Sequence, residues 1–362
     1  MGIGIMTIRR TYGVIFFLVI TVLLNGCSDT NKQVDGSQGL TIPKSPIMAL
    51  ELNSSNVSYN KIQNNRILKV GSSSDISNMV YNINANVTAY TKILSKGKEL
   101  NNVEIYIEKN DNVYRLNNFY NADNLKLSPD GNMLVYRTFK KDSLESAQGL
   151  KVYDINHNKE MRINKDSLVS GTLYEWLDED NLLYYAVKNG KTDSDKIYKY
   201  NFTSKKEEVY LDKINGYCTY FTVEKGNILF FSKLGDDTNL SYYYKNTGKV
   251  KTLNNNFSDI YDSVYNAVTK EFFILARDKY GVTGLFKVNV ENNTCKRVNY
   301  DFPKLINKDG GISADINGNV YFSGTSDRSD NPQYDIYMYN VNDNSINLLS
   351  SHPSNYIVIS SN

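Results

Sequence analysis

The hydrophobic residues of this chain follow two distinct patterns. Residues 14–24 form one continuous apolar run, which is preceded by Arg9 and Arg10. After that run, apolar and aromatic residues occur in short stretches that alternate with polar residues and end at Asn, Asp or Gly. No long window beyond residue 24 has apolar residues at helical spacing. The pattern therefore predicts an all-β chain after the N-terminal segment.

The expected strands form a repeat of about 46 residues. Each unit contains a two-residue turn and then a strand of apolar and aromatic residues, and these turns start at residues 85, 131, 180, 226, 270 and 318. Most of the turns carry Asn at the second position, a residue that tolerates the positive φ of tight hairpins. A third and a fourth strand follow, as at Val103–Ile107 and Lys196–Tyr200. Four antiparallel strands in a unit of this length are typical of a β-propeller blade.

Strands also remain at both ends of the repeat region. Tyr356–Ile359 lies where the first strand of another unit would begin. Residues 57–59 and 66–70, which a turn at Asn64 and Asn65 joins, lie at the offsets of a third and a fourth strand. We therefore predict seven blades, with the last built from the C-terminal strand and N-terminal strands together, because this closure removes open strand edges. A six-bladed ring with loose ends is the alternative.

One unit carries a recognisable motif. Residues 127–136, LSPDGNMLVY, resemble the S-P-D-G-x-x-[IL]-x-[FY] core of the WD40-like repeats in TolB-type propellers. Residues 174–180, YEWLDED, look like a decayed copy, and the other units keep the spacing and the apolar pattern. The resemblance implies a propeller fold for nearly all of the mature chain. It implies little about function, because such propellers serve both as partner-binding platforms and as accessories of enzymes.

The N-terminal segment resembles that of bacterial lipoproteins. Its apolar run is too short to span a bilayer comfortably and ends at Leu24-Asn25-Gly26-Cys27, which is similar to a lipobox. In that family the chain is cleaved before the cysteine, here between Gly26 and Cys27, and the cysteine is acylated. The resemblance implies a signal peptide at 1–26, a polar tether at 27–50 and a propeller domain at 51–362. It also implies a lipid on Cys27 that anchors the protein to the extracytoplasmic side of a bacterial cell membrane. The alternatives are an ordinary signal peptide and an uncleaved helix in which Cys27 is incidental.

Charge argues against one class of partner, and the cysteine content argues against disulfide bonds. The chain has 41 basic and 39 acidic residues, a net charge of +2, and no basic block, so we expect no nucleic-acid partner. Beyond Cys27 only Cys218 and Cys295 remain. Cys218 falls on an innermost strand and Cys295 beside an outermost one, so we expect both to be unpaired. Trp176, the single tryptophan, falls on a first strand and is expected to pack between blades.

Catalytic motifs are scarce in this sequence. The two histidines, His157 and His352, are expected to be exposed turn residues, and no G-x-S-x-G, H-E-x-x-H, C-x-x-C or phosphate-binding glycine-rich motif occurs. Carboxylates cluster at 178–180 and at Asp236 and Asp237, but neither cluster has the spacing of a calcium loop. We expect these clusters to be solvated turns, and we predict no metal and no cofactor.

The longer loops form the expected binding face. In a propeller the connections between second and third strands, and those between blades, lie on the side opposite the tight turns. Here they are longer and more polar, as at 140–148 and 324–331. Since loops carry function more often than the scaffold does, we predict a non-catalytic module that binds a protein, peptide or glycan on this face. Solvated loops without a function are one alternative. The other is a hydrolase or lyase that acts on an extracellular polymer through carboxylates about 5–10 Å apart in the central channel.

Overall fold

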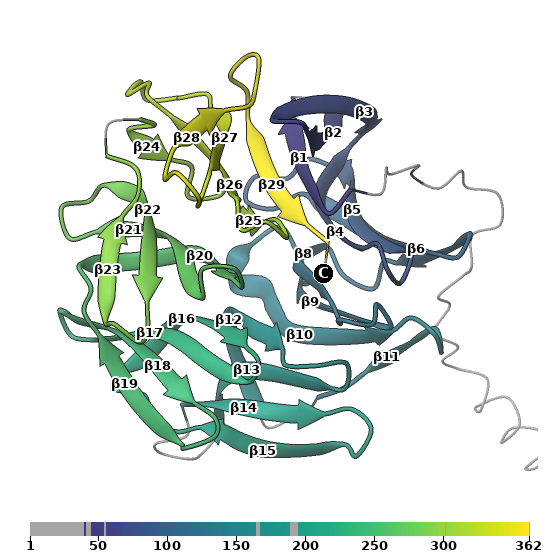
Figure 1. The fold of residues 1–362 in the computed structure, drawn as a ribbon. Coiled ribbons are helices and arrows are strands. Elements are labelled where there is room, and N and C mark those ends of the chain that lie inside the picture. The colour runs from purple at the N-terminus through teal and green to yellow at the C-terminus, as the bar shows by residue number, and fades with distance from the viewer. Residues whose placement is uncertain are drawn as a thin grey trace, which may run out of the picture. The chain divides into compact units, whose positions relative to one another are not determined.

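The computed structural model describes residues 40, 45–53, 56–163, 167–188, 195–300 and 302–361. These residues form seven antiparallel blades arranged in a ring (Figure 1). Among them the only helical element is a 3₁₀ turn, η1 (Leu144–Ser146). The all-β prediction and the preferred count of seven blades are both confirmed.

Five blades follow the order of the chain. Blade 1 contains β4 (Ile76–Asn82), β5 (Val87–Ser95), β6 (Asn102–Lys109) and β7 (Asn112–Leu116). Blade 2 contains β8 (Asn121–Leu127), β9 (Met133–Phe139), β10 (Ala147–Asp154) and β11 (Lys159–Met161). Blade 3 contains β12 (Ser167–Trp176), β13 (Asn181–Lys188), β14 (Lys196–Asn201) and β15 (Lys206–Leu211). Blade 4 contains β16 (Tyr217–Glu224), β17 (Asn227–Leu234), β18 (Asp237–Tyr244) and β19 (Lys249–Leu253). Blade 5 contains β20 (Phe257–Asn266), β21 (Glu271–Asp278), β22 (Thr283–Asn289) and β23 (Thr294–Arg297).

Blade 6 differs in its innermost strand, which is split. The two short pieces are β24 (Leu305–Ile306) and β25 (Ile312–Ala314), and both pair with β26 (Val320–Thr325). The blade continues through β27 (Asp335–Tyr339) and β28 (Ile346–Leu348).

Blade 7 closes the ring with strands from both ends of the chain. Its order is β29 (Tyr356–Ser360), β1 (Ile47–Leu52), β2 (Asn56–Gln63) and β3 (Arg66–Ser74). In Figure 1 the yellow β29 lies beside the purple β1, and Ala49 is opposite Val358 in the antiparallel register. The predicted mixed blade is thus confirmed, with its turn at Asn64 and Asn65, both at positive φ.

The propeller begins slightly before residue 51. β1 starts at Ile47, within the segment expected to be a tether. The backbone N–H of Leu40 also donates to Glu108 at 2.7 Å, and the carbonyl of Ser45 accepts from the Tyr81 hydroxyl at 2.9 Å. These described residues upstream of 51 therefore contact blade 1.

The S-P-D-G motif builds the turn before β9. The Ser128 hydroxyl accepts backbone N–H groups from Asn132 and Met133 and donates to Asp130. The positive φ falls on Gly131, at +66°, rather than on Asn132. A Cβ on Gly131 would lie 2.5 Å from the Cβ of Ala85 in blade 1, so glycine also permits the close approach of two blades.

Buried asparagines link neighbouring blades at this end of the inner strands. The side-chain amide of Asn82, at the end of β4, donates to the carbonyl of Pro129 in the next blade at 2.8 Å. Asn266, at the end of β20, donates in the same way to the carbonyl of Gly318 at 2.6 Å. Each side-chain oxygen accepts backbone N–H groups of its own turn. One amide therefore orders a turn and fixes the next blade against it.

The core consists of hydrophobic clusters that each join two neighbouring blades. Trp176 packs in the cluster between blades 2 and 3, and its indole N–H donates to the carbonyl of Lys126. Cys218 lies buried on the innermost β16, whereas Cys295 lies on the outermost β23, and both are free thiols. The expected core role of Trp176 and the expected separation of these two cysteines are confirmed.

Deleting residues 355–362 should lower stability strongly. The deletion removes β29, whose Tyr356 and Val358 pack against blade 6 while Ile357 and Ile359 pack towards blade 1. Loss of the two fully buried side chains alone should cost about 3–6 kcal/mol in the free energy of unfolding. Urea unfolding, monitored by circular dichroism, measures this free energy. Ser360→Ala, which keeps the strand, is the control, and a deletion variant as stable as this control would contradict the closure.

Candidate functional site

The two faces of the ring carry different connections. The tight turns between first and second strands, and between third and fourth strands, lie on one face. The connections between second and third strands, and between blades, lie on the other, which we call the long-loop face. Most of the large apolar side chains that are exposed among the described residues belong to this face: Leu94, Leu144, Leu168, Val187, Tyr217, Leu234, Tyr280, Tyr300 and Phe302. Val268 and Ile316 are exposed in tight turns of the opposite face.

The predicted binding loop at 140–148 is braced by the neighbouring blade. The Asp142 carboxylate accepts backbone N–H groups from Leu100, Lys98 and Glu99 at 2.7, 2.7 and 3.0 Å. These bonds hold the pKa of Asp142 below its ordinary value. In return, the Glu99 carboxylate accepts the N–H of Leu144 at 3.0 Å. Two carboxylates thus join the long loops of blades 1 and 2 into one ordered surface.

Shallow cavities flank this braced loop on both sides. One of about 540 Å³ lies between blades 1 and 2, with Leu94, Phe119 and Lys140 in its wall. Another of about 470 Å³ lies between blades 2 and 3, with Arg137 and Leu168 in its wall. Gln148, at the end of the loop, lines both cavities. The loop therefore separates two recesses of a size that proteins use for ligands.

The second predicted loop, 324–331, is ordered mainly by its own side chains. The Thr325 hydroxyl accepts the N–H of Asp327, and Asp327 accepts both the N–H and the hydroxyl of Ser329. These bonds lower the pKa of Asp327. No cavity described above is lined by residues of this loop.

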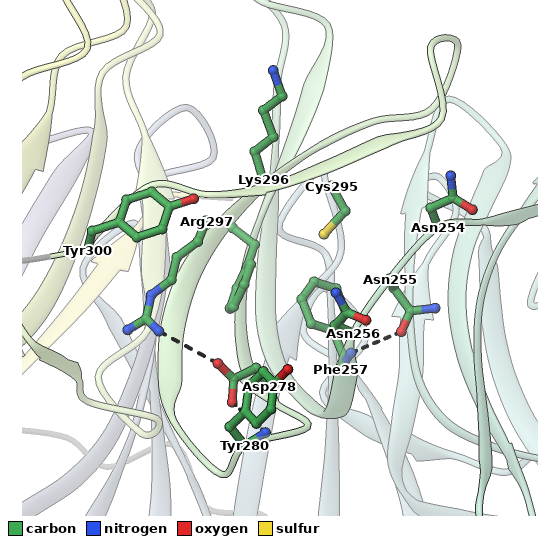
Figure 2. A pocket seen from close by; sticks show the side chains of 11 residues that line it. Asn254, Asn255, Asn256, Phe257, Asp278, Tyr280, Cys295, Lys296, Arg297 and Tyr300 are labelled. Carbon is green, nitrogen blue, oxygen red and sulfur yellow. Dashed lines mark hydrogen bonds and ion pairs between the residues drawn. The ribbon is translucent and has the colours of Figure 1, made fainter.

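A larger cavity, of about 640 Å³, lies on blade 5 (Figure 2). Its wall combines the connection Asn254–Asn256, which enters β20, with Asp278 at the end of β21 and Tyr280 in the loop that follows. Phe257 and Phe286 form an aromatic floor, and β23 with Tyr300 completes the opposite side. We call this the blade-5 cavity. No sequence motif marks this cavity, although the connections that line it all belong to the long-loop face by their position in the repeat.

The charges inside the blade-5 cavity compensate each other. The Arg297 guanidinium lies 3.6 Å from the Asp278 carboxylate and donates to the carbonyl of Asn299 at 2.6 Å. Asp278 also accepts the backbone N–H groups of Tyr280 and Val282, which orders the loop. Lys296 extends away from these side chains in Figure 2. Burial raises the pKa of the Cys295 thiol to about 12, so this thiol is not a ready nucleophile.

The innermost strands bring together a second group of polar side chains, which we call the channel cluster. Lys126 on β8 forms an ion pair with Glu175 on β12 and donates to the carbonyl of Tyr174. Asp262 on β20 is near enough to this pair for both charges to act on its pKa. The Tyr220 hydroxyl lies 2.7 Å from that of Ser263. Two carboxylates, Glu175 and Asp262, therefore lie on innermost strands and interact electrostatically.

The polar contacts of the channel cluster connect neighbouring blades. One oxygen of Asp262 accepts the N–H of Ser263 at 2.8 Å, and the other accepts the N–H of Ile312 in blade 6 at 3.2 Å. Glu175 is held by Lys126 of the preceding blade. Since an innermost strand has an unpaired edge, side chains that bond to neighbouring strands satisfy backbone groups there. This arrangement favours a structural role for the cluster.

The remaining candidates from the sequence are turn residues. Asp178 accepts the backbone N–H groups of Asp180 and Asn181, and Asp237 begins β18 directly after a turn. His157 bonds to Asp154 and His352 to Glu51, and both rings are mostly exposed. Among the described residues no group of three or more His, Cys, Asp or Glu side chains could hold a metal ion. The expected exposure of both histidines is confirmed.

Asp262 should make stability depend on pH. Burial raises the pKa of its carboxyl to about 6, and the N–H of Ser263 and the charge of Lys126 oppose this only in part. Between about pH 4 and pH 6 the folded state keeps a proton on Asp262 that the unfolded chain releases. The free energy of unfolding therefore falls as pH rises through this range, by up to about 3 kcal/mol in total. Asp262→Asn should therefore gain stability relative to the parent protein between pH 4 and pH 7.

The measurement is urea unfolding of parent and variant across that pH range. Asp259→Asn on the same strand is the control, because it removes an ion pair with Lys233 and should show no such gain. A stability difference between Asp262→Asn and the parent that is the same at pH 4 and pH 7 would argue against the raised pKa.

Gly26 and Cys27, the predicted cleavage and lipid-attachment residues, lie outside the described residues. Within the part of the chain that the structure describes, no helix has the length and apolar character needed to cross a membrane.

Comparisons with known proteins support the fold alone. No protein-family model matches this chain, and no curated protein does either. An uncharacterised protein of Listeria monocytogenes EGD-e has a similar structure, with a TM-score of 0.55, 12% identity, and coverage of 84% of this chain and 91% of that one. A prolyl endopeptidase gives a TM-score of 0.55 and 9% identity over 87% of this chain and 50% of that one. TolB from Acinetobacter baumannii is also among the similar structures, with a TM-score of 0.47, 14% identity, and coverage of 86% and 82%.

Proposed function

We propose that this protein is an exported, lipid-anchored propeller that binds a protein, peptide or glycan partner through its long-loop face without catalysing a reaction. In this proposal Cys27 carries the lipid and Gly26 precedes the cleavage point. The domain then lies on the extracytoplasmic side of a bacterial membrane.

The observation that carries the binding function is the distribution of exposed apolar side chains. They are concentrated on the long-loop face, whereas the tight-turn face has few among the described residues. Exposed apolar groups rimmed by polar residues are typical of interaction surfaces. The bonds of Asp142 and Glu99 order part of this face in advance, which lowers the entropy that a partner would have to remove on binding.

A catalytic role receives less support from the contacts. A general acid or base needs an oxygen that can reach a substrate. In the channel cluster both oxygens of Asp262 accept backbone N–H groups, and Glu175 is paired with Lys126. We therefore retain binding as the function that the geometry favours.

A photo-crosslinking amino acid placed at Leu144 should capture the partner in native membranes. Leu144 lies in η1 of the braced loop and is 58% exposed. The matched control carries the crosslinker at Ile316, which is 93% exposed in a tight turn of the opposite face. We expect adducts from position 144 and none from position 316, and we expect replacement of residues 140–148 by a short Gly-Ser turn to abolish partner capture. Equal labelling from both positions would refute a binding face made by the long loops.

Cys27→Ser should prevent lipid attachment. The variant should either release a folded propeller into the medium or accumulate as an unprocessed precursor, since the lipid is the proposed anchor. Metabolic labelling with a fatty acid, followed by fractionation of cells and medium, measures both results. Cys295→Ser, at a half-buried position on β23, should keep its lipid label. Unchanged labelling of Cys27→Ser would disprove the lipoprotein assignment.

A further inference from the structure

The blade-5 cavity presents one asparagine amide and two tyrosine hydroxyls that have no hydrogen-bond partner among the residues that the structure describes. The amide of Asn256 makes no hydrogen bond to another described residue, although its backbone carbonyl accepts the N–H of Lys279 at 2.8 Å. The hydroxyls of Tyr280 and Tyr300 likewise have no hydrogen-bond partner among the described residues. Tyr280 is 79% exposed and Tyr300 is 70% exposed. These groups therefore remain available to a ligand.

The fold holds the backbone segments that carry Asn256 and Tyr280. Asn255 accepts the N–H of Phe257 at 3.0 Å, which fixes the start of β20, and Asn254 is bonded to Asn293 of blade 5. The Asp278 turn holds the backbone of Tyr280. Figure 2 shows the asparagines on one side of the cavity and Tyr300 on the other, with Tyr280 near the Asp278 turn. A preorganised wall of this kind reduces the cost of ordering groups on binding.

We infer that the blade-5 cavity binds a neutral glycan, and this inference rests on the proposed binding function. A sugar hydroxyl is both a donor and an acceptor, which matches the two halves of an asparagine amide. The apolar C–H face of a pyranose ring can stack on an exposed tyrosine, whose amphipathic ring suits a site that is partly wet. A cavity of about 640 Å³ is within the size range of small-molecule sites.

Charge selects a neutral ligand for this site. Arg297 and Asp278 neutralise each other, and the guanidinium is further engaged by backbone carbonyls, so it is not free to bind a carboxylate or phosphate. A peptide is less suited, because peptide sites supply apolar pockets for side chains. Here the apolar floor is already covered: Phe257 is 2% exposed and Phe286 is 7% exposed.

Calorimetric titration of the full-length protein with neutral hexasaccharides tests the inference. The probes are cellohexaose, chitohexaose, maltohexaose and xylohexaose. We expect at least one of them to bind, and we expect Tyr280→Ala and Tyr300→Ala each to weaken that binding by about tenfold, because each removes a stacking surface. Asn256→Ala should also weaken it. Tyr217→Ala removes a tyrosine that is 53% exposed on the long-loop face of blade 4, outside the cavity, and should leave the affinity unchanged.

The outcomes separate this inference from the proposed function. If none of the four hexasaccharides binds, or if binding is insensitive to Tyr280→Ala and Tyr300→Ala, the glycan site is overturned. The same holds if a peptide partner binds in a manner that needs both tyrosines. Adducts formed from the crosslinker at Leu144 would still support the long-loop face in each of these cases. Absence of those adducts with intact hexasaccharide binding would instead overturn the protein-docking role of the braced loop.

Discussion

The pairing of β29 with β1 is the interaction on which the rest of the ring depends. It joins residues at opposite ends of the domain. The side chains of β29 alternate between two hydrophobic clusters. Tyr356 and Val358 pack towards blade 6, and Ile357 and Ile359 pack towards blade 1. Every other blade is made from strands that are consecutive in the sequence, whereas this pairing joins the two ends of the propeller. Because the hydrophobic clusters lie between blades rather than within them, each blade needs both neighbours to bury its faces.

The same constraint explains where charged side chains are placed. The innermost strands have an unpaired edge, and Lys126, Glu175 and Asp262 bond across blade boundaries beside it. Asn82 and Asn266 do so at the ends of their strands with uncharged amides. Buried polar groups that are satisfied in this way fix the positions of the blades. Ionised Asp262 costs stability, since burial raises the pKa of its carboxyl, and its two backbone bonds offset only part of that cost.

The sequence predicted the architecture because the repeat is a local signal. Turn residues and apolar strands recur in each unit, and the offset of the repeat located both the third strand near Val57 and the C-terminal strand that closes the ring. The blade-5 cavity could not be predicted in the same way. Asn256, Tyr280 and Tyr300 come from three separate connections, and only the packing of blade 5 brings them around one cavity. Likewise, Glu175 and Asp262 lie in different blades, far apart in the sequence. No short sequence motif therefore shows that they interact.

The braced loop and the blade-5 cavity lie on blades that are not neighbours. Blades 3 and 4 separate them along one side of the ring, and blades 6, 7 and 1 along the other. The chemistry of the two sites also differs: the first offers exposed Leu144 beside carboxylates that are bonded to backbone N–H groups, and the second offers the amide of Asn256 and two exposed tyrosines. Under the two proposals above, a glycan in the cavity and a protein at the braced loop would occupy separate blades of one ring. Because the two proposed occupants would contact different blades, they do not compete for the same residues.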